Sequence, residues 1–321
     1  MNAGVQAGVA TGRRSNRSIA VDSASWGSLF NNSLWMLLLS GPWLYERLMR
    51  RAFMIAGARS RRLAFQAGSL HVLDLKGTGT LPPVMLLHGF SASGASQYGA
   101  LVRHLRSHVS RIILPDLPGH GLSSVPSRLD DEVMVEALEA VAERFIHRPT
   151  VIFAASMAGG VAVRFAQAQP ERLAGLMLCS PGGAPIAPDQ LDEFRATFRI
   201  GSHRQALAFV DRLFPRRHPL RQAYAWGVRQ QFNRPHLVGL LERLGDLQFL
   251  QPDELRRLSI PVSLVWGRRD HILPPSQLEF YRAHLPAHAE IDTPPSFGHA
   301  PFLHQADAVA RKLLRFARRV S

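Results

Sequence analysis

The sequence predicts an α/β fold with a mainly parallel sheet and helices on both of its faces. Five short apolar runs recur along the chain, VMLLH, RIILP, TVIFAA, LAGLMLC and VSLVWG, and each is followed by loop residues or a helical period. The helical spacing of residues 131–146 places Met134, Leu138, Val141 and Phe145 on one face. An earlier stretch, RLAFQAGSLHVLDL, is typical of an antiparallel hairpin. Strands that alternate with helices in this way form mainly parallel sheets.

The 321 residues divide into three parts by composition. Residues 1–60 form an N-terminal extension, residues 61–183 and 252–321 form the α/β core, and residues 184–251 form a helical insertion between two core strands. The insertion is too long for a plain loop. We therefore expect one folded body that carries an insertion, rather than several independent modules.

The charge of the chain is strongly positive, with a formal net charge of +14 and a pI near 11.3. Almost every basic residue is an arginine, and the arginines are scattered, with no basic stripe interleaved with aromatic residues. We therefore expect no nucleic-acid partner. The single cysteine, Cys179, lies in an apolar run and is expected to be a small buried side chain. No spacing of Cys and His predicts a metal site, and no motif predicts a cofactor.

The N-terminal extension has an apolar centre, Leu34–Tyr45, which Gly41 and Pro42 interrupt. It is shorter than the roughly 20 apolar residues that cross a bilayer, and the arginines and the glutamate after it fit a cleaved signal peptide poorly. Two interpretations stay open. The segment lies on an anionic membrane surface, with its tryptophans at the interface and its arginines facing headgroups, or it packs on the body of the protein. The expected location is cytoplasmic, with peripheral membrane contact in the first case.

Polar residues follow the predicted strands at their carboxyl ends, where parallel sheets bind their ligands. Ser156 comes directly after TVIFAA, Asp270 follows VSLVWG, and His299 lies in the later loop FGHAPFLH. The chain order is therefore serine, aspartate, histidine. This order is expected when a nucleophile lies on a turn from a strand to a helix and its partners come from later strand ends.

These residue types together favour nucleophilic catalysis. A serine hydroxyl needs a general base, so His299 is expected to take the proton of Ser156, and Asp270 to hold the imidazole in the required tautomer. The oxyanion needs preorganised donors, for which the backbone N–H groups of Met157 and Phe90 are the candidates.

Simpler interpretations exist for each of these residues. A lone serine at this place would more often cap a helix than attack a substrate. Asp292 and Asp253 are competing acids, but neither follows the strand that precedes the histidine loop, so Asp270 is preferred. His88 is expected to order its loop and to have no catalytic role.

The stretches LLHGFSASG, DLPGHGLSS, ASMAGG, WGRRDHILP and FGHAPFLH occur in this order over residues 62–321. Together they resemble the α/β-hydrolase superfamily, although the usual G-x-S-x-G turn is A-A-S-M-A here. The resemblance implies that residues 184–251 form a helical cap that shapes the substrate pocket. Seven apolar side chains of the insertion could line this pocket: Phe194, Phe198, Phe209, Phe214, Trp226, Leu240 and Leu241.

Within the superfamily, the sequence resembles two branches. One contains monoacylglycerol-lipase-like esterases, and the other contains hydrolases that cleave carbon–carbon bonds in ring-fission diketones. We favour a serine hydrolase that cleaves a carboxylic ester, either lipid-like or of another apolar acyl group, through an acyl-enzyme, without cofactor or metal. The alternatives are carbon–carbon bond hydrolysis and a non-catalytic member of the fold that binds a ligand. The acyl chain length and the oligomeric state stay open.

Overall fold

The computed structural model describes residue 1 and residues 46–90, 93–245 and 248–321. The expectations for the apolar segment Leu34–Tyr45 lie outside the described residues.

The described residues form an eight-stranded sheet in the order β1-β2-β4-β3-β5-β6-β7-β8. The strands are β1 (Arg59–Phe65), β2 (Gly68–Lys76), β3 (Val84–Leu87), β4 (Arg111–Asp116), β5 (Thr150–Ala155), β6 (Leu173–Cys179), β7 (Val262–Val265) and β8 (Glu290–Asp292). The β1–β2 and β2–β4 pairs are antiparallel, and the other pairs are parallel. This confirms the predicted α/β fold with its initial hairpin.

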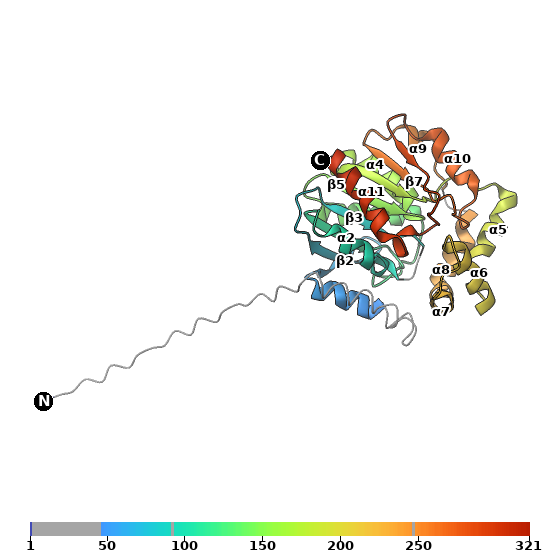
Figure 1. Cartoon of the computed structure of the whole chain (residues 1–321), viewed down its shortest axis with the longest axis horizontal. Helices are drawn as coiled ribbons and strands as arrows, with labels where there is room; N and C mark the ends of the chain where they lie inside the picture. Colours follow the sequence, from blue (N-terminus) through green and yellow to red (C-terminus); the bar gives the residue numbers. More distant parts are fainter. Residues whose placement is uncertain (2–45, 91–92, 246–247) are drawn as a thin grey trace.

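Helices cover both faces of the sheet (Figure 1). On one face, α2 (Gly99–Leu105) packs against α11 (Ala306–Arg319), and both contribute to one apolar core cluster. The opposite face carries α3 (Asp131–Phe145) and α4 (Ala158–Ala168), which belong to a second cluster together with α9 (Pro252–Arg256) and α10 (Pro275–His284). The strands between the two layers are buried on both sides, as expected for a parallel sheet.

The predicted helical face of residues 131–146 is present in α3, where Met134, Leu138 and Val141 are buried. The helix begins after Asp130, whose side chain accepts a hydrogen bond from the Val133 N–H at 3.1 Å. This is an N-cap interaction, which satisfies one of the free N–H groups of the first turn.

The insertion between β6 and β7 is helical. Its larger elements are α5 (Pro188–Phe198), α6 (His203–Leu213), α7 (Arg221–Phe232) and α8 (Pro235–Glu242). The helices are joined by aromatic contacts, in which Phe198 and Phe232 stack with their ring centroids 6.4 Å apart and Phe209 packs on both. In Figure 1 these helices lie beside the sheet, on the right of the molecule.

Residues 46–55 are helical and pack on the body of the protein. Met49 and Phe53 are buried, and Phe53 joins the same core cluster as α2 and α11. Arg50 is also buried, with its Nη1 atom 2.9 Å from the Asp116 carboxylate. Of the two interpretations left open for the N-terminal extension, packing on the body therefore applies to Arg50, whose side chain does not face lipid headgroups. No helix in the described ranges is long and apolar enough to cross a membrane.

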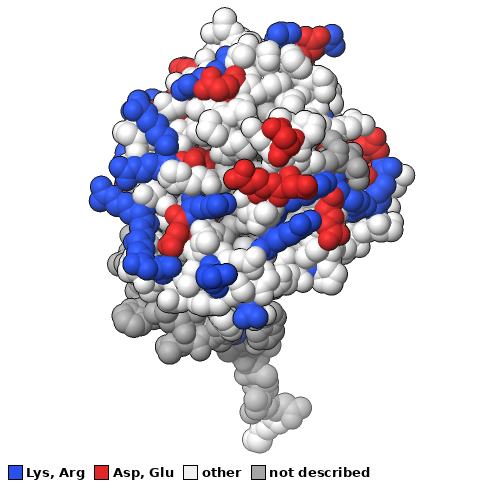
Figure 2. Space-filling model, turned by 90° about the vertical axis from the view of Figure 1, so that its right-hand side faces the viewer, with Lys and Arg blue, Asp and Glu red and all other residues white. Residues whose placement is uncertain are grey.

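The surface charge is distributed in several places rather than in one stripe. Figure 2 shows the face that carries the insertion, where groups of basic side chains alternate with acidic ones. Many arginines are paired within the molecule, for example Arg164 with Asp131 and Glu254. Cys179 lies on β6 and is 1% exposed, as expected for a small buried side chain.

Candidate active site

Ser156 occupies a sharp turn between β5 and α4. Its φ angle is +51°, a conformation that costs free energy for a residue with a Cβ atom. The Ser156 carbonyl accepts hydrogen bonds from the N–H groups of Gly159 at 2.8 Å and Gly182 at 2.9 Å, which hold the turn in place. The turn therefore forms with the alanines Ala154 and Ala158, both fully buried, at the two positions where G-x-S-x-G has glycine.

The three side chains predicted from chain order lie together at the carboxyl ends of the strands. The His299 Nε2 atom is 3.0 Å from the Ser156 Oγ atom, and its Nδ1 atom is 2.8 Å from Asp270 Oδ2. His299 is 8% exposed, and the Asp270 side chain is 1% exposed. The arrangement allows a proton to move from the serine hydroxyl to the imidazole, with the carboxylate behind it.

Asp270 is built to stay ionised. Burial raises the pKa of its carboxyl group, but the neighbouring His299 and the backbone N–H groups of Ile272 and Leu273 lower it further than burial raises it. These two N–H groups donate to Asp270 Oδ1 at 2.9 and 3.1 Å. The lowered pKa keeps the carboxylate charged, so that it can accept the Nδ1–H of the histidine.

The competing acids lie elsewhere. Asp292 is on β8 and pairs with Lys312, and Asp253 is on α9 and pairs with Arg256 at 3.1 Å. Neither contacts His299 within the described residues. The preference for Asp270 agrees with this geometry.

The loop after β3 lies directly against the nucleophile. A Cβ atom built on Gly89 would lie 2.8 Å from the Ser156 Cβ atom and 3.2 Å from the Ala155 carbonyl oxygen, so only glycine fits here. This close contact places the Gly89–Phe90 peptide beside Ser156. Met157 follows Ser156 in the chain and precedes the first residue of α4, so the peptides that carry the Phe90 N–H and the Met157 N–H both adjoin the serine residue.

His88 fixes the orientation of that peptide. Its Nε2 atom accepts a hydrogen bond from the Leu117 N–H at 2.9 Å, so its Nδ1 atom carries the proton and donates to the Gly89 carbonyl at 2.8 Å. Burial lowers the pKa of His88 and keeps it neutral. The Gly89 carbonyl and the Phe90 N–H belong to one planar peptide unit, so fixing the carbonyl also fixes the N–H. This is the loop-ordering role expected for His88.

Two residues of α10 that sequence analysis missed hold the loop after β6. The Tyr281 hydroxyl donates to the Gly182 carbonyl at 2.7 Å, and the Gln277 side chain donates to the Ala184 carbonyl at 2.8 Å. Both side chains are buried. Their spacing of four residues, which places both on one face of a helix, was the available signal, but it does not identify the loop that they bind.

An apolar pocket opens beside Ser156, between the sheet and the insertion. Four of the seven predicted side chains line it: Phe194, Phe198, Leu240 and Leu241. Side chains of the core complete the wall, among them Phe90, Met134 and Val161. The other three predicted residues are not part of this wall: Phe209 packs within the insertion, Phe214 contacts Tyr224 of the insertion and His304 of the core, and Trp226 is 43% exposed. In the described part of the chain, no group of three or more His, Cys, Asp or Glu side chains could hold a metal ion.

Comparison with known proteins identifies the family of the chain. A family model for the α/β-hydrolase fold matches residues 82–305. A pimeloyl-(acyl-carrier protein) methyl ester esterase of Xanthomonas campestris pv. campestris is 30% identical over 271 residues, which cover 76% of this chain and 97% of the relative.

Two solved structures show the same fold. A membrane phospholipase A, described as a bacterial virulence factor, has a TM-score of 0.74 at 21% identity and covers 91% of this chain and 95% of its own. The 2-hydroxy-6-oxo-6-phenylhexa-2,4-dienoate hydrolase from a Rhodococcus strain has a TM-score of 0.70 at 23% identity, with 81% and 99% covered. The family model spans more than half of the chain and the curated relative is an esterase, so the chain belongs to the α/β-hydrolase family and is a carboxylester hydrolase.

Proposed function

We propose that the protein hydrolyses an ester of an apolar acyl group through a covalent acyl-enzyme on Ser156. The observation that carries the proposal is the contact between His299 Nε2 and Ser156 Oγ at 3.0 Å, with Asp270 on the other side of the imidazole. The serine oxygen attacks the ester carbonyl carbon while its proton passes to His299. The imidazolium then protonates the leaving alcohol, and water hydrolyses the acyl-enzyme by the same route.

The backbone N–H groups of Phe90 and Met157 would stabilise the oxyanion of each tetrahedral intermediate. The proximity of Gly89 to Ser156 supports Phe90 as one donor, and the position of Met157 at the N-terminus of α4 supports the other. The N-terminus of a helix carries a partial positive charge, which favours a developing negative charge there.

The pocket supports an apolar acyl chain as the substrate class. Its walls are mainly aromatic and aliphatic, and Ser156 and Met157 lie in the same wall. The relatives named as pimeloyl-(acyl-carrier protein) methyl ester esterases support an acyl ester with a small alcohol group. We therefore propose a small alkyl ester of an acyl chain as the substrate.

Labelling with a fluorophosphonate probe tests the nucleophile, with Ser156→Ala as the control. A series of p-nitrophenyl esters from short to long chains then measures the acyl preference, and a vinylogous diketone acid tests carbon–carbon cleavage in parallel. We expect labelling of the wild type only, and turnover of esters. Turnover of the diketone acid without ester hydrolysis would contradict the proposed substrate class.

We further propose that the protein is cytoplasmic and that the residues before 46 make peripheral contact with an anionic membrane surface. The composition of Leu34–Tyr45, with two tryptophans and several leucines close to arginines, supports this proposal. Co-sedimentation of the full chain with anionic liposomes at low and high salt tests it. We expect the protein to bind the liposomes at low salt and to bind them more weakly at high salt. A protein that stays in the supernatant at low salt would contradict the proposed membrane contact.

A further inference from the structure

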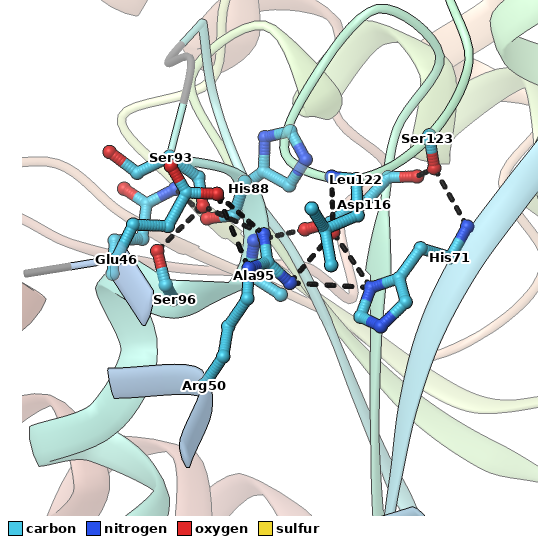
Figure 3. Close-up of polar contacts among 12 residues, drawn as sticks. Glu46, Arg50, His71, His88, Ser93, Ala95, Ser96, Asp116, Leu122 and Ser123 are labelled. Atoms are coloured by element: carbon cyan, nitrogen blue, oxygen red, sulfur yellow. Dashed lines mark hydrogen bonds and ion pairs between the residues drawn. The ribbon is translucent and has the colours of Figure 1, made fainter. Parts of the chain in front are cut away.

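A buried charged network connects residues 46–55 to the loops beside the active site (Figure 3). Arg50 is at its centre. The guanidinium contacts Asp116 Oδ2 at 2.9 Å through Nη1, and its Nη2 donates to Glu46 at 2.9 Å. The side chain of Asp116, at the end of β4, is completely buried. The helix thus places a positive charge directly on a carboxylate that water does not reach.

Asp116 organises the loops on both sides of it. Its Oδ1 atom accepts a hydrogen bond from the Ala95 N–H at 2.7 Å, and its Oδ2 atom accepts from the Leu122 N–H at 3.0 Å. Gly94 and Gly121 both have a φ of +55°, and a Cβ atom at either would collide with the carboxylate. The two loops are therefore folded closely around this single charged group.

A series of hydrogen bonds between described residues also links Asp116 to the Phe90 N–H. Leu117 follows Asp116 and donates its N–H to His88 Nε2 at 2.9 Å, and His88 donates to the Gly89 carbonyl at 2.8 Å. The Gly89–Phe90 peptide unit carries the Phe90 N–H. The position of Asp116 therefore influences where that N–H points.

A second connection passes through Ser93. The Arg50 guanidinium lies 3.5 Å from the Ser93 carbonyl, while the Ser93 hydroxyl donates to Gln231 on α7 of the insertion at 3.0 Å. Arg50 thus contacts one loop that reaches both the core and the insertion.

From these contacts we infer that Arg50 is a positioning residue for the oxyanion hole: through Asp116 and His88 it sets the orientation of the Phe90 N–H. The inference rests on the proposed function, in which this N–H stabilises the oxyanion. It also assigns a role in catalysis to residues 46–55, which lie outside the part of the chain that the family model matches.

The charge balance explains why Arg50 cannot be replaced by a neutral side chain without a change in geometry. A buried carboxylate that loses its cation must shift, admit water or take up a proton. His71 donates to the same Oδ2 atom at 2.8 Å, but it is a neutral donor unless it takes up a second proton. Glu46 adds a second negative charge to the network. In the Arg50→Met variant, Asp116 would keep its N–H donors without a permanent positive charge.

The test compares Arg50→Met with Arg51→Met, since Arg51 is an exposed neighbour on the same helix. Active sites are counted by fluorophosphonate titration, so that kcat is expressed per active site. The other measurements are KM for a short soluble ester, the affinity for a trifluoromethyl ketone that forms a tetrahedral adduct, and the melting temperature. The ketone adduct depends on the oxyanion hole, whereas ground-state substrate binding depends on the pocket.

We expect Arg50→Met to lower kcat per active site by about 10- to 100-fold, because a misplaced donor costs less than the loss of a whole oxyanion-hole donor. The ketone should bind weaker by a similar factor, while KM changes little and Arg51→Met behaves like the wild type. A fall only in melting temperature or in the number of active sites, with kcat per site and ketone affinity unchanged, would overturn the inference.

A second variant covers the case in which Arg50→Met does not fold. Arg50→Lys keeps the charge but loses the planar guanidinium that spans Asp116 and Glu46. We expect it to lower kcat per active site less than Arg50→Met does, and to weaken ketone binding by a similar factor. An unchanged kcat per active site and an unchanged ketone affinity in Arg50→Lys would then overturn the inference. A wild type that hydrolyses no ester would overturn the proposed function instead, and the rate of fluorophosphonate labelling of Ser156 in Arg50→Met would still decide on Arg50.

Discussion

Gly89 lies against Ser156 so closely that a Cβ atom on the glycine would be 2.8 Å from the serine Cβ atom. Any other residue at position 89 must therefore push the loop after β3 away from the nucleophile. We expect Gly89→Ala to lower kcat by about a hundredfold, the size of effect measured when one oxyanion donor is lost. Steady-state kinetics on a soluble ester measures it. Gly239→Ala on α8 is the matched control, because a Cβ atom there meets nothing within 4 Å. Equal activity of the two variants would contradict the prediction.

The hydrogen bonds from His299 to Ser156 and Asp270 predict the effect of removing the nucleophile or the base. Ser156→Ala and His299→Ala should each reduce kcat by about a thousandfold or more and leave the fold intact, since both groups act in the same step. Circular dichroism checks the fold, and hydrolysis of a p-nitrophenyl ester checks the activity. Full activity of Ser156→Ala would exclude the acyl-enzyme mechanism.

The acid is tested by two conservative substitutions. Asp270→Asn should strongly reduce kcat, because an amide cannot stabilise the imidazolium and favours the wrong tautomer. Asp292→Asn should leave kcat within a few fold, because Asp292 lies on the edge strand β8 and pairs with Lys312 of α11. If Asp292→Asn were the damaging change and Asp270→Asn the harmless one, our assignment of the acid would be reversed.

Asp116 gives the protein a stability that depends on pH. Burial raises the pKa of this carboxyl group, but His71, Arg50 and the Ala95 N–H lower it further, and it falls well below its usual range. In the unfolded chain this carboxyl group has a pKa of about 4. Because its pKa in the folded protein is lower, the ionised group stabilises the fold above that pH, and this stabilisation is lost as the pH falls toward the folded-state pKa. Removal of Arg50 raises the folded pKa and reduces this contribution.

We therefore expect Arg50→Met to unfold at a higher pH than the wild type when it is titrated with acid. Tryptophan fluorescence and circular dichroism follow the transition. The exposed control, Arg51→Met, should unfold with the wild type. Coinciding acid transitions for Arg50→Met and the wild type would show that Arg50 does not support the charge of Asp116.

The apolar pocket predicts that a larger side chain in its wall shortens the acyl chain that fits. Val161 on α4 is buried and lines the pocket. Val161→Phe should lower kcat/KM for long acyl esters more than for short ones, because the added ring occupies the space of the chain. Val125→Phe, at a position that is 50% exposed, is the control. An unchanged chain-length profile in Val161→Phe would place the acyl chain elsewhere.

Sequence analysis located the three proposed catalytic side chains because each of them follows a strand. Ser156 directly follows β5 and Asp270 lies in the loop after β7, so the parallel sheet itself brings them to one edge. Strands β5 and β7 were recognisable because they are buried on both faces and therefore have continuous apolar sequences. Local pattern and position in the sheet were sufficient for Ser156 and Asp270. His299 lies after the short and mostly exposed strand β8, so its place in the chain order and its loop sequence were the signals for it.

The network around Asp116 could not be predicted in the same way. Arg50 and Asp116 are far apart in the sequence, and the chain contains many arginines that could pair with any given carboxylate. The same limit applied to the pocket wall. The composition identified apolar residues of the insertion, but which of them face the pocket depends on how its helices pack, so Trp226 was included although it is 43% exposed.

Cys179 makes the protein suitable for site-specific labelling. It is the only cysteine in the sequence, it is 1% exposed on β6, and burial raises the pKa of its thiol far above neutral pH. Since the thiolate is the reactive form, maleimides and other thiol reagents should leave the native chain unmodified. A cysteine introduced in place of the exposed Trp226 on α7 would then carry the only dye. Fluorescence from that position would report whether the insertion moves when a substrate binds, with no need to remove the native cysteine.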